Sequence, residues 1–148
     1  MIEGVIIQEL KQLRDDRGRV MHMLRADSSM FKKFGEIYFS VTNPGVVKAW
    51  KRHLKMTQHF AVPLGRIRLV IYDDRKNSAS CGKTEVMEIG EDNYCLVRIP
   101  PLVLYGFKAI SKAPALIANC TDIPYDPNEI ESLDIFDKKI PYDWNLRH

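Results

Sequence analysis

The sequence predicts an all-β domain of the sandwich or barrel type. Short apolar or alternating runs recur along the chain, and they are rich in the β-branched and aromatic residues that strands favour. Turn-forming residues separate these runs at short intervals. The expected strands are 5–10, 19–24, 35–42, 46–50, 57–63, 66–72, 84–89, 94–99, 105–109 and 115–120.

Glycine, proline, aspartate and asparagine mark the connections between these runs, because each sets a turn through its φ angle or a local hydrogen bond. The run at 66–72 shows the clearest alternation, with Ile67, Leu69 and Ile71 on one face. We expect this strand to be central and mostly buried. The turns are expected at 15–18, 42–45, 64–65, 73–78, 90–93 and 100–101.

The tail differs from the rest of the chain. From Tyr125 onward it is richer in acidic residues and proline, and residues 127–133 can supply one short helix. Residues 140–144, Ile-Pro-Tyr-Asp-Trp, are expected to pack an aromatic end back on the body. No linker, repeat or low-complexity segment interrupts the sequence, so residues 1–148 are expected to form a single domain.

Composition and charge limit the classes of function. A chain of 148 residues that is 45% hydrophobic can bury a real core. Its 22 basic and 19 acidic residues are spread along the length and give a net charge of +3. Nucleic acid is therefore not expected as a partner, whereas a phosphate-bearing small ligand is compatible with this charge.

Cysteine usage and the N-terminus indicate the compartment. Cys81, Cys95 and Cys120 are odd in number and widely spaced, which predicts neither a disulfide framework nor a zinc site. The N-terminus has an early acid, and no segment approaches the roughly 18 apolar residues of a membrane span. We expect a soluble, unprocessed protein of the cytoplasm without a membrane partner.

The most informative stretch runs from Gly45 to Gly65. Alternate side chains of a strand share a face, so Lys51 and His53 point the same way, and a polar row on an inner face is costly unless it lines a wet pocket or is paired. The spacing of Gly45, Lys51, His53, Gln58 and Gly65 resembles the first cupin motif, in which two histidines and a glutamate stand between two glycines. This resemblance implies a jelly roll, or double-stranded β-helix.

Metal-binding cupins hold their ion with those two histidines, the glutamate and a further histidine after an Ile-Pro turn. The matching positions here are Lys51, His53, Gln58 and Tyr105, the last one following Ile99-Pro100. A protonated lysine has no lone pair, and an amide and a neutral phenol are weak ligands. We therefore expect no metal. The alternative is two ordinary β-hairpins with surface charges, but the spacing and the Ile-Pro turn together favour a cupin pocket.

Over nearly its whole length the chain resembles the dTDP-4-dehydrorhamnose 3,5-epimerase family of cupins. The resemblance implies a cofactor-independent enzyme acting on a nucleoside-diphosphate 4-keto-6-deoxy sugar in deoxysugar and polysaccharide biosynthesis, such as that of lipopolysaccharide O-antigen. It also implies a homodimer that exchanges N-terminal strands. The matching segments are 16–18, 39–46, 65–78, 91–93, 99–100, 106–107, 121–127, Glu129 and 140–144.

Family epimerases remove the protons at C3 and C5, beside the C4 ketone, with a histidine base buttressed by an aspartate, and a tyrosine is the proposed acid. Asp137 matches the buttressing aspartate, whereas Lys51 replaces the base and Ala118 replaces the tyrosine. Lys51 can act as a base or Schiff-base nucleophile, because a desolvated amine titrates below its usual pKa of about 10.4. Alternatively it binds a diphosphate or carboxylate, or pairs with Asp137. Tyr105 can replace the missing phenol as acid.

Sugar-nucleotide 3,4-ketoisomerases resemble these epimerases and carry a His-x-His pair followed by a glutamine. His53 and Gln58 match the second histidine and the glutamine, while Lys51 again replaces the first histidine. His53 is thus the imidazole that both interpretations leave in the pocket, where it suits proton shuttling. A third hypothesis is a binding-only cupin, because Lys51 and Ala118 replace both the base and the acid.

The resemblance also implies the substrate-binding residues. Arg17 matches the arginine that grips the nucleotide phosphates and can act on the partner's site in an exchanged dimer, and Lys48 stands where the epimerases have an arginine. The predicted catalytic residues are Lys51, His53, Tyr105 and Asp137. The predicted substrate-binding residues are Arg17, Glu36, Tyr38, Lys48, Gln58 and Glu129.

Overall fold

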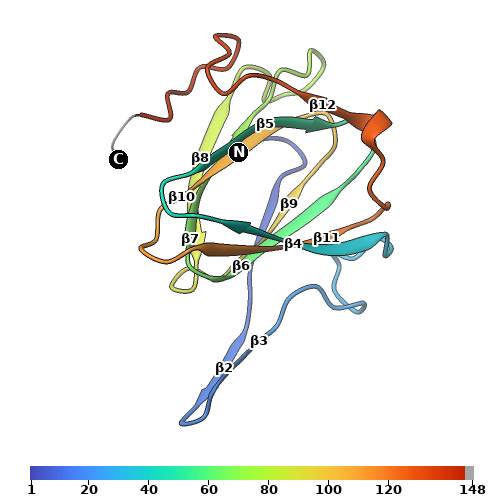
Figure 1. Cartoon of the computed structure of the whole chain (residues 1–148). Coiled ribbons are helices and arrows are strands. Elements are labelled where there is room, and N and C mark those ends of the chain that lie inside the picture. The colour runs from blue at the N-terminus through green and yellow to red at the C-terminus, as the bar shows by residue number, and fades with distance from the viewer. Residues whose placement is uncertain (146–148) are drawn as a thin grey trace.

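The computed structural model describes residues 1–145. Within this span the strands are β1 (Ile6–Glu9), β2 (Gln12–Asp15), β3 (Gly18–Met21), β4 (Glu36–Thr42), β5 (Val47–His53), β6 (Gln58–Leu64), β7 (Arg66–Tyr72), β8 (Thr84–Gly90), β9 (Cys95–Ile99), β10 (Leu104–Ala109), β11 (Ala115–Thr121) and β12 (Ile130–Ser132). In these residues two five-stranded antiparallel sheets, ordered β1-β9-β6-β11-β4 and β12-β5-β10-β7-β8, face each other (Figure 1). The predicted all-β jelly roll is confirmed.

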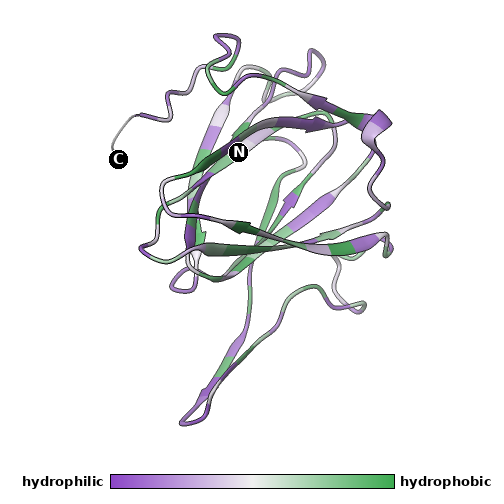
Figure 2. Cartoon of the chain, in the orientation of Figure 1, coloured by the Kyte–Doolittle hydropathy of each residue, from purple (hydrophilic) through white to green (hydrophobic). Residues whose placement is uncertain are grey.

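The main core lies between the two sheets, and hydrophobic positions recur along the strands of both (Figure 2). Ile67, Leu69 and Ile71 of β7 are fully buried there, and β7 runs between β10 and β8. The prediction of a central, buried strand is therefore confirmed. Its alternation predicted this correctly because side chains two residues apart share a face.

The aromatic end of the chain packs as expected. Trp144 lies against Trp50 of β5, with ring centroids 5.1 Å apart, and Tyr142 packs edge-on against both indoles. Val70, Leu104 and Ile140 also belong to this second apolar cluster. The tail thus covers the face of the β12-β5-β10-β7-β8 sheet that points away from the main core, since Val70 alternates with its core-facing neighbours.

The N-terminal part of the chain departs from the prediction. A strand was expected at 19–24, but β3 ends at Met21 and pairs with β2, and this hairpin projects away from both sheets (Figure 1). The four residues of β2, Gln-Leu-Arg-Asp, include one apolar side chain, so they form no apolar run that a sequence pattern would reveal.

The helix expected at 127–133 is one turn of 3₁₀ helix, η1 (Pro127–Glu129), capped by the Asp126 carboxylate that accepts a hydrogen bond from the Asn128 N–H. From Ile130 the chain extends as β12, because its backbone pairs with the edge strand β5 instead of continuing the helix. This pairing sets Glu129 beside the end of β5. No helix among the described residues is long and apolar enough to span a membrane.

Candidate active site

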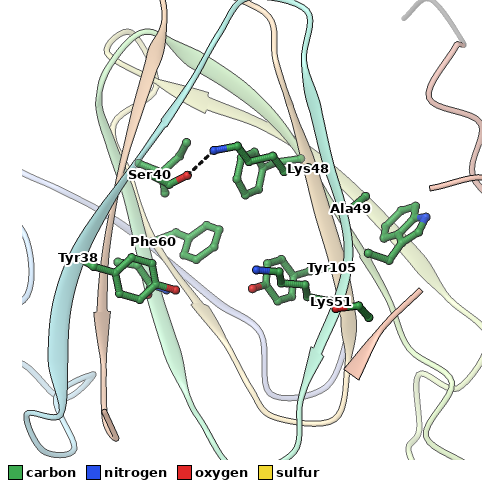
Figure 3. Close-up of a pocket in the computed structure, with 12 residues that line it drawn as sticks. Tyr38, Ser40, Lys48, Ala49, Lys51, Phe60 and Tyr105 are labelled. Carbon is green, nitrogen blue, oxygen red and sulfur yellow. Dashed lines mark hydrogen bonds between the residues drawn. The ribbon is translucent and has the colours of Figure 1, made fainter. Parts of the chain in front are cut away.

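A cavity of about 300 Å³ lies between the two sheets and is open to solvent. Its walls combine aromatic side chains with hydroxyl, amide and ammonium groups (Figure 3). Such a mixture is typical of small-molecule sites, where apolar surface gives affinity and a few polar groups fix orientation. The lining residues are Tyr38, Ser40, Lys48, Ala49, Trp50, Lys51, Phe60, Tyr105, Phe107, Ile117, Asn119 and Ser132.

Strand pairing places two of the predicted catalytic residues side by side. Lys51 of β5 is the direct partner of Tyr105 of β10, and the register then shifts between Tyr105 and Gly106. A Cβ at Gly106 would lie 2.4 Å from the Cβ of Ala49, so glycine alone fits this close approach of the two strands. Backbone pairing therefore holds the side chains of Lys51 and Tyr105 next to each other on one wall of the cavity.

A hydrogen-bond network crosses the floor of the cavity from one sheet to the other. The Tyr105 hydroxyl donates to Gln58 Oε1 at 3.1 Å and lies 3.4 Å from His53 Nε2. The Asn119 amide nitrogen donates both to Gln58 Oε1 at 2.9 Å and to the Tyr38 hydroxyl oxygen at 2.8 Å. The Tyr38 oxygen thus acts as an acceptor, which leaves its own proton for a group in the cavity.

Behind Tyr105 lies a buried pair of titratable groups. His53 Nδ1 is 2.5 Å from Glu129 Oε2, and the two side chains are 5% and 3% exposed. The second oxygen of Glu129 accepts hydrogen bonds from the backbone N–H groups of Lys55 and Met56. Glu129 therefore fixes the His53 ring to the turn that follows β5.

The charge of Glu129 decides how His53 is protonated. Burial raises the pKa of the Glu129 carboxyl, but hydrogen bonds from His53, Lys55 and Met56 outweigh burial and lower this pKa below its ordinary value of 4.5. An ionised carboxylate only accepts hydrogen bonds, so Nδ1 of His53 carries a proton. In neutral His53 the lone pair of Nε2 then points to Tyr105.

Both tyrosines of the cavity remain phenols at neutral pH. Burial is the main cause that raises the pKa of Tyr105 and the pKa of Tyr38 above the ordinary value of 10.0. They lie on different sides of the cavity, Tyr38 on β4 and Tyr105 on β10 (Figure 3). The cavity therefore offers a neutral hydroxyl group on each side.

Two lysines give the cavity positive charge. Lys48 reaches from β5 to β4, where its ammonium donates to the Ser40 hydroxyl at 3.0 Å and to the Val41 carbonyl at 3.1 Å (Figure 3). Lys51 is exposed and lines the same cavity. Cations of this kind suit the phosphates or the developing oxyanion of a bound ligand.

The structure thus brings together most of the residues predicted from the sequence. The cavity is lined by Lys48, Lys51, Tyr38 and Tyr105. Its hydrogen-bonded support consists of His53, Gln58 and Glu129. Among the described residues, no three His, Cys, Asp or Glu side chains gather in a way that could hold a metal ion.

Three predicted residues lie elsewhere in this chain. Arg17 is exposed at the turn of the β2–β3 hairpin, where it pairs with Asp15 at 2.6 Å. Glu36 accepts a hydrogen bond from the Tyr125 N–H, and Asp137 accepts one from the Lys139 N–H in the tail. None of the three lines the cavity described above.

Sequence reasoning missed Asn119, which links the two walls of the cavity. It stands on β11 in the run Ala-Leu-Ile-Ala-Asn-Cys-Thr and is 1% exposed. Its Oδ1 accepts from the His59 N–H at 3.2 Å, while its two amide hydrogens serve Tyr38 and Gln58. The available signal was an amide within an apolar strand, because a buried polar group needs partners.

The chain is similar to known proteins over nearly its whole length. A family model described as dTDP-4-dehydrorhamnose 3,5-epimerase matches residues 1–148. The "probable low-salt glycan biosynthesis epimerase Agl13" of Haloferax volcanii is 41% identical over 144 residues, which cover 96% of this chain and 89% of that protein. The spore coat polysaccharide biosynthesis protein SpsL of Bacillus subtilis is 34% identical over 143 residues, covering 97% of this chain and 91% of that protein.

A solved structure of a dTDP sugar isomerase has nearly the same backbone fold as this chain. The crystal structure of a dTDP sugar isomerase from Desulfovibrio desulfuricans G20 matches with a TM-score of 0.95 and 51% sequence identity, and the match covers 97% of this chain and 92% of that one. The sheets that form the cavity are therefore shared with a protein of similar sequence.

Proposed function

This chain belongs to the dTDP-4-dehydrorhamnose 3,5-epimerase family and is a sugar-nucleotide epimerase, and from that premise we propose its substrate and chemistry. The substrate is a nucleoside-diphosphate 4-keto-6-deoxy sugar, and the reaction inverts C3, C5 or both. The glycan and polysaccharide roles in the names of its relatives support a place in the biosynthesis of surface polysaccharide.

One observation carries this proposal: the cavity presents an ammonium group and two phenols around a space of sugar size. Removing a proton beside a ketone leaves an enolate, whose oxygen carries negative charge and requires hydrogen-bond donors or cations. The exposed Lys51 supplies the cation for the C4 oxygen. Tyr105 and Tyr38 supply hydroxyl groups on the two sides of the sugar, as inversion of a carbon requires.

Positive side chains account for the nucleotide part of the substrate. Lys48 lies at the cavity wall and can turn its ammonium from Ser40 to a phosphate oxygen. Arg17 lies at the turn of the projecting hairpin. We propose that it binds the nucleotide phosphates in the site of a second chain. Glu36 and Asp137 lie outside this cavity and receive no role in the chemistry proposed for it.

The exposed apolar residues support a homodimer with exchanged N-terminal strands. Ile37, Phe39 and Val41 alternate along the edge strand β4 and are 47%, 62% and 60% exposed. Leu13 and Val20 of the projecting hairpin are also exposed. An open sheet edge with an apolar face is typical of a surface that another chain covers. Phe39→Glu is expected to yield a monomer in sedimentation, whereas an unchanged mass would reject this interface.

We place the enzyme in the cytoplasm. Cys81, Cys95 and Cys120 are all unpaired, and free thiols persist in a reducing compartment.

The test of function is proton exchange in D₂O. The enzyme is incubated with dTDP-4-dehydrorhamnose and with its 3,5-epimer, and the products are followed by NMR. Deuterium at C3 or C5, with the carbonyl still at C4, is expected. The matched control is Tyr125→Phe, which alters an exposed phenol outside the cavity and should leave the rate unchanged.

A second candidate function is the 3,4-ketoisomerase reaction. It is favoured by the meeting of His53 and Gln58 at one hydroxyl, that of Tyr105. A carbonyl at C3 of the product would assign this reaction. If no keto sugar nucleotide exchanges protons, a binding-only cupin remains.

A further inference from the structure

We propose that Glu129, His53 and Tyr105 form a proton relay, in which the Tyr105 hydroxyl exchanges protons with the sugar carbon. The inference rests on the proposed epimerase function and specifies how that site moves a proton. Within the relay Tyr105 is the catalytic residue, because its side chain lines the cavity. His53 and Glu129 are positioning residues, because they act through it.

Two successive contacts connect the buried Glu129 carboxylate to the cavity. Glu129 Oε2 lies 2.5 Å from Nδ1 of His53, and Nε2 of the same ring lies 3.4 Å from the Tyr105 hydroxyl. The rings of His53 and Tyr105 are nearly parallel, with centroids 6.2 Å apart. Catalytic hydrogen bonds are often long in free enzymes and shorten when the substrate binds.

Tyr105 needs a partner to act as a base. Burial raises the pKa of its hydroxyl, so a free tyrosinate is costly at neutral pH. The hydroxyl has two neighbours that accept its hydrogen, Gln58 Oε1 and His53 Nε2. An amide oxygen accepts a hydrogen bond but is far too weakly basic to take the proton, whereas an imidazole nitrogen can take it.

The Tyr105 oxygen takes the proton from C3 or C5 while its own hydroxyl proton passes to Nε2 of His53. The electron pair of the broken C–H bond becomes the enolate, with its charge on the C4 oxygen beside Lys51. Tyr105 remains neutral, and His53 becomes an imidazolium ion paired with the Glu129 carboxylate.

Inversion is completed from the other side of the cavity. The Tyr38 hydroxyl donates its proton to the opposite face of the same carbon and becomes a phenolate, while Asn119 donates a hydrogen bond to its oxygen. Water then protonates Tyr38, and His53 returns its extra proton through Tyr105 to solvent. No oxidant or reductant takes part, and one solvent proton replaces one substrate proton.

The relay assigns to Glu129 a role beyond substrate binding. The family resemblance gives Asp137 the role of orienting the base at position 51. In the described residues, Asp137 makes its hydrogen bond to the Lys139 N–H, whereas Glu129 contacts an imidazole directly. His53 therefore has a carboxylate of its own, two residues along β5 from the position where the family carries its base.

The central test is Glu129→Gln. The amide oxygen can still accept from the Lys55 and Met56 N–H groups, so folding should be preserved. The amide NH₂ then faces Nδ1 of His53, which must become an acceptor, and the ring proton moves to Nε2. Since Nε2 can no longer accept from Tyr105, kcat is expected to fall by about 100-fold with KM changed less than about threefold.

Two comparisons distinguish a relay from independent contributions. Glu131→Gln alters an exposed carboxylate two residues away on β12 and should leave kcat unchanged. His53→Asn and Tyr105→Phe should each lower kcat by about 100-fold or more, and the double variant should be little worse than the worse single variant. The relay would be overturned if the loss of kcat in the double variant equalled the product of the two single losses. A Glu129→Gln enzyme with the wild-type kcat would also overturn it.

A measurement without substrate separates the relay from the proposed function. Nitrogen-15 NMR of histidine in the free wild-type enzyme should show His53 with its proton on Nδ1, and Glu129→Gln should move that proton to Nε2. A wild-type ring protonated on Nε2 alone refutes the relay even if the enzyme is active. If no keto sugar exchanges protons while the NMR result is as expected, the proposed function fails and the Glu129–His53 pair stands.

Discussion

Two buried carboxylates, Asp73 and Glu129, lie at different places in this fold and share burial and a lowered pKa. Asp73 follows β7 and is 0% exposed, and Glu129 is the last residue of η1 and is 3% exposed. Burial raises the pKa of each carboxyl, and hydrogen bonds to the ionised form outweigh it in both. Neither burial nor pKa therefore distinguishes a structural from a functional carboxylate.

The hydrogen bonds of the two groups lead to different places. Asp73 accepts from the Arg75 guanidinium and from the Ser78 and Ser80 hydroxyls, all within the loop that begins at Asp73 itself. The bonds of Glu129 lead through His53 to the hydroxyl of Tyr105 in the cavity. A carboxylate enclosed by its own loop stabilises the fold, whereas one connected to a titratable group at a cavity can move a proton.

The largest expected effect comes from Tyr38, which lies on the side of the cavity opposite Tyr105. Tyr38→Phe removes the proposed proton donor on the opposite side of the cavity and leaves the relay intact. Formation of epimer is expected to fall by about 1,000-fold, while solvent deuterium still enters the unreacted substrate. Mass spectrometry of substrate and product in D₂O measures both. Loss of deuterium exchange together with epimer formation would place Tyr38 on the same side as Tyr105.

The second prediction concerns the enclosed carboxylate. Asp73→Asn keeps the shape of the side chain but leaves Arg75 without its charge partner. The free energy of unfolding is expected to fall by about 3 kcal/mol, because removing one member of a buried pair costs this much. Denaturant unfolding measures the loss, and kcat of the folded enzyme should not change. A selective loss of kcat would make Asp73 part of the active site.

The third prediction uses the lowered pKa of Asp73 to test the same contrast at acidic pH. A carboxyl whose folded-state pKa lies below its ordinary value of 3.8 contributes stability that is complete above 3.8 and lost as the pH falls toward the folded-state pKa. The wild type should lose about 1 kcal/mol more per pH unit below 3.8 than Asp73→Asn. Equal acid sensitivity of the two proteins, measured by denaturant unfolding between pH 4 and about pH 2, would contradict the enclosed charge.

The sequence could predict the fold because its signals are local. Alternation at 66–72 predicted β7 with its buried face, and turn residues separated most strands correctly. The turn at 15–18 and part of β3 were predicted, but β2 escaped because its four residues, Gln-Leu-Arg-Asp, hold one apolar side chain and so form no strand pattern. The second half of the helix expected at 127–133 is strand β12 instead. Its pairing with β5 is a tertiary contact, which local propensity cannot predict.

The candidate site was predictable where its residues are close in sequence. Lys51, His53 and Gln58 belong to one motif, and strand pairing brings Tyr105 to them. The contact between His53 and Glu129 joins residues 76 positions apart, so no spacing rule predicts it. Sequence reasoning could name Glu129 as a site residue, but its partner depends on how η1 and β12 are placed against β5.

The smallest expected effect is that of a change at Lys48, which tests whether this cavity residue binds substrate or takes part in proton transfer. Lys48 lines the cavity but contacts Ser40 and the Val41 carbonyl, not the Glu129–His53–Tyr105 chain. Lys48→Gln should therefore raise KM for the sugar nucleotide about fivefold at low salt and leave kcat unchanged, because one phosphate-binding charge is lost. Lys112→Gln, at an exposed lysine that does not line the cavity, is the matched control. If KM stays constant while kcat falls, Lys48 takes part in the chemistry, and the proton path then extends beyond Tyr105 along β5.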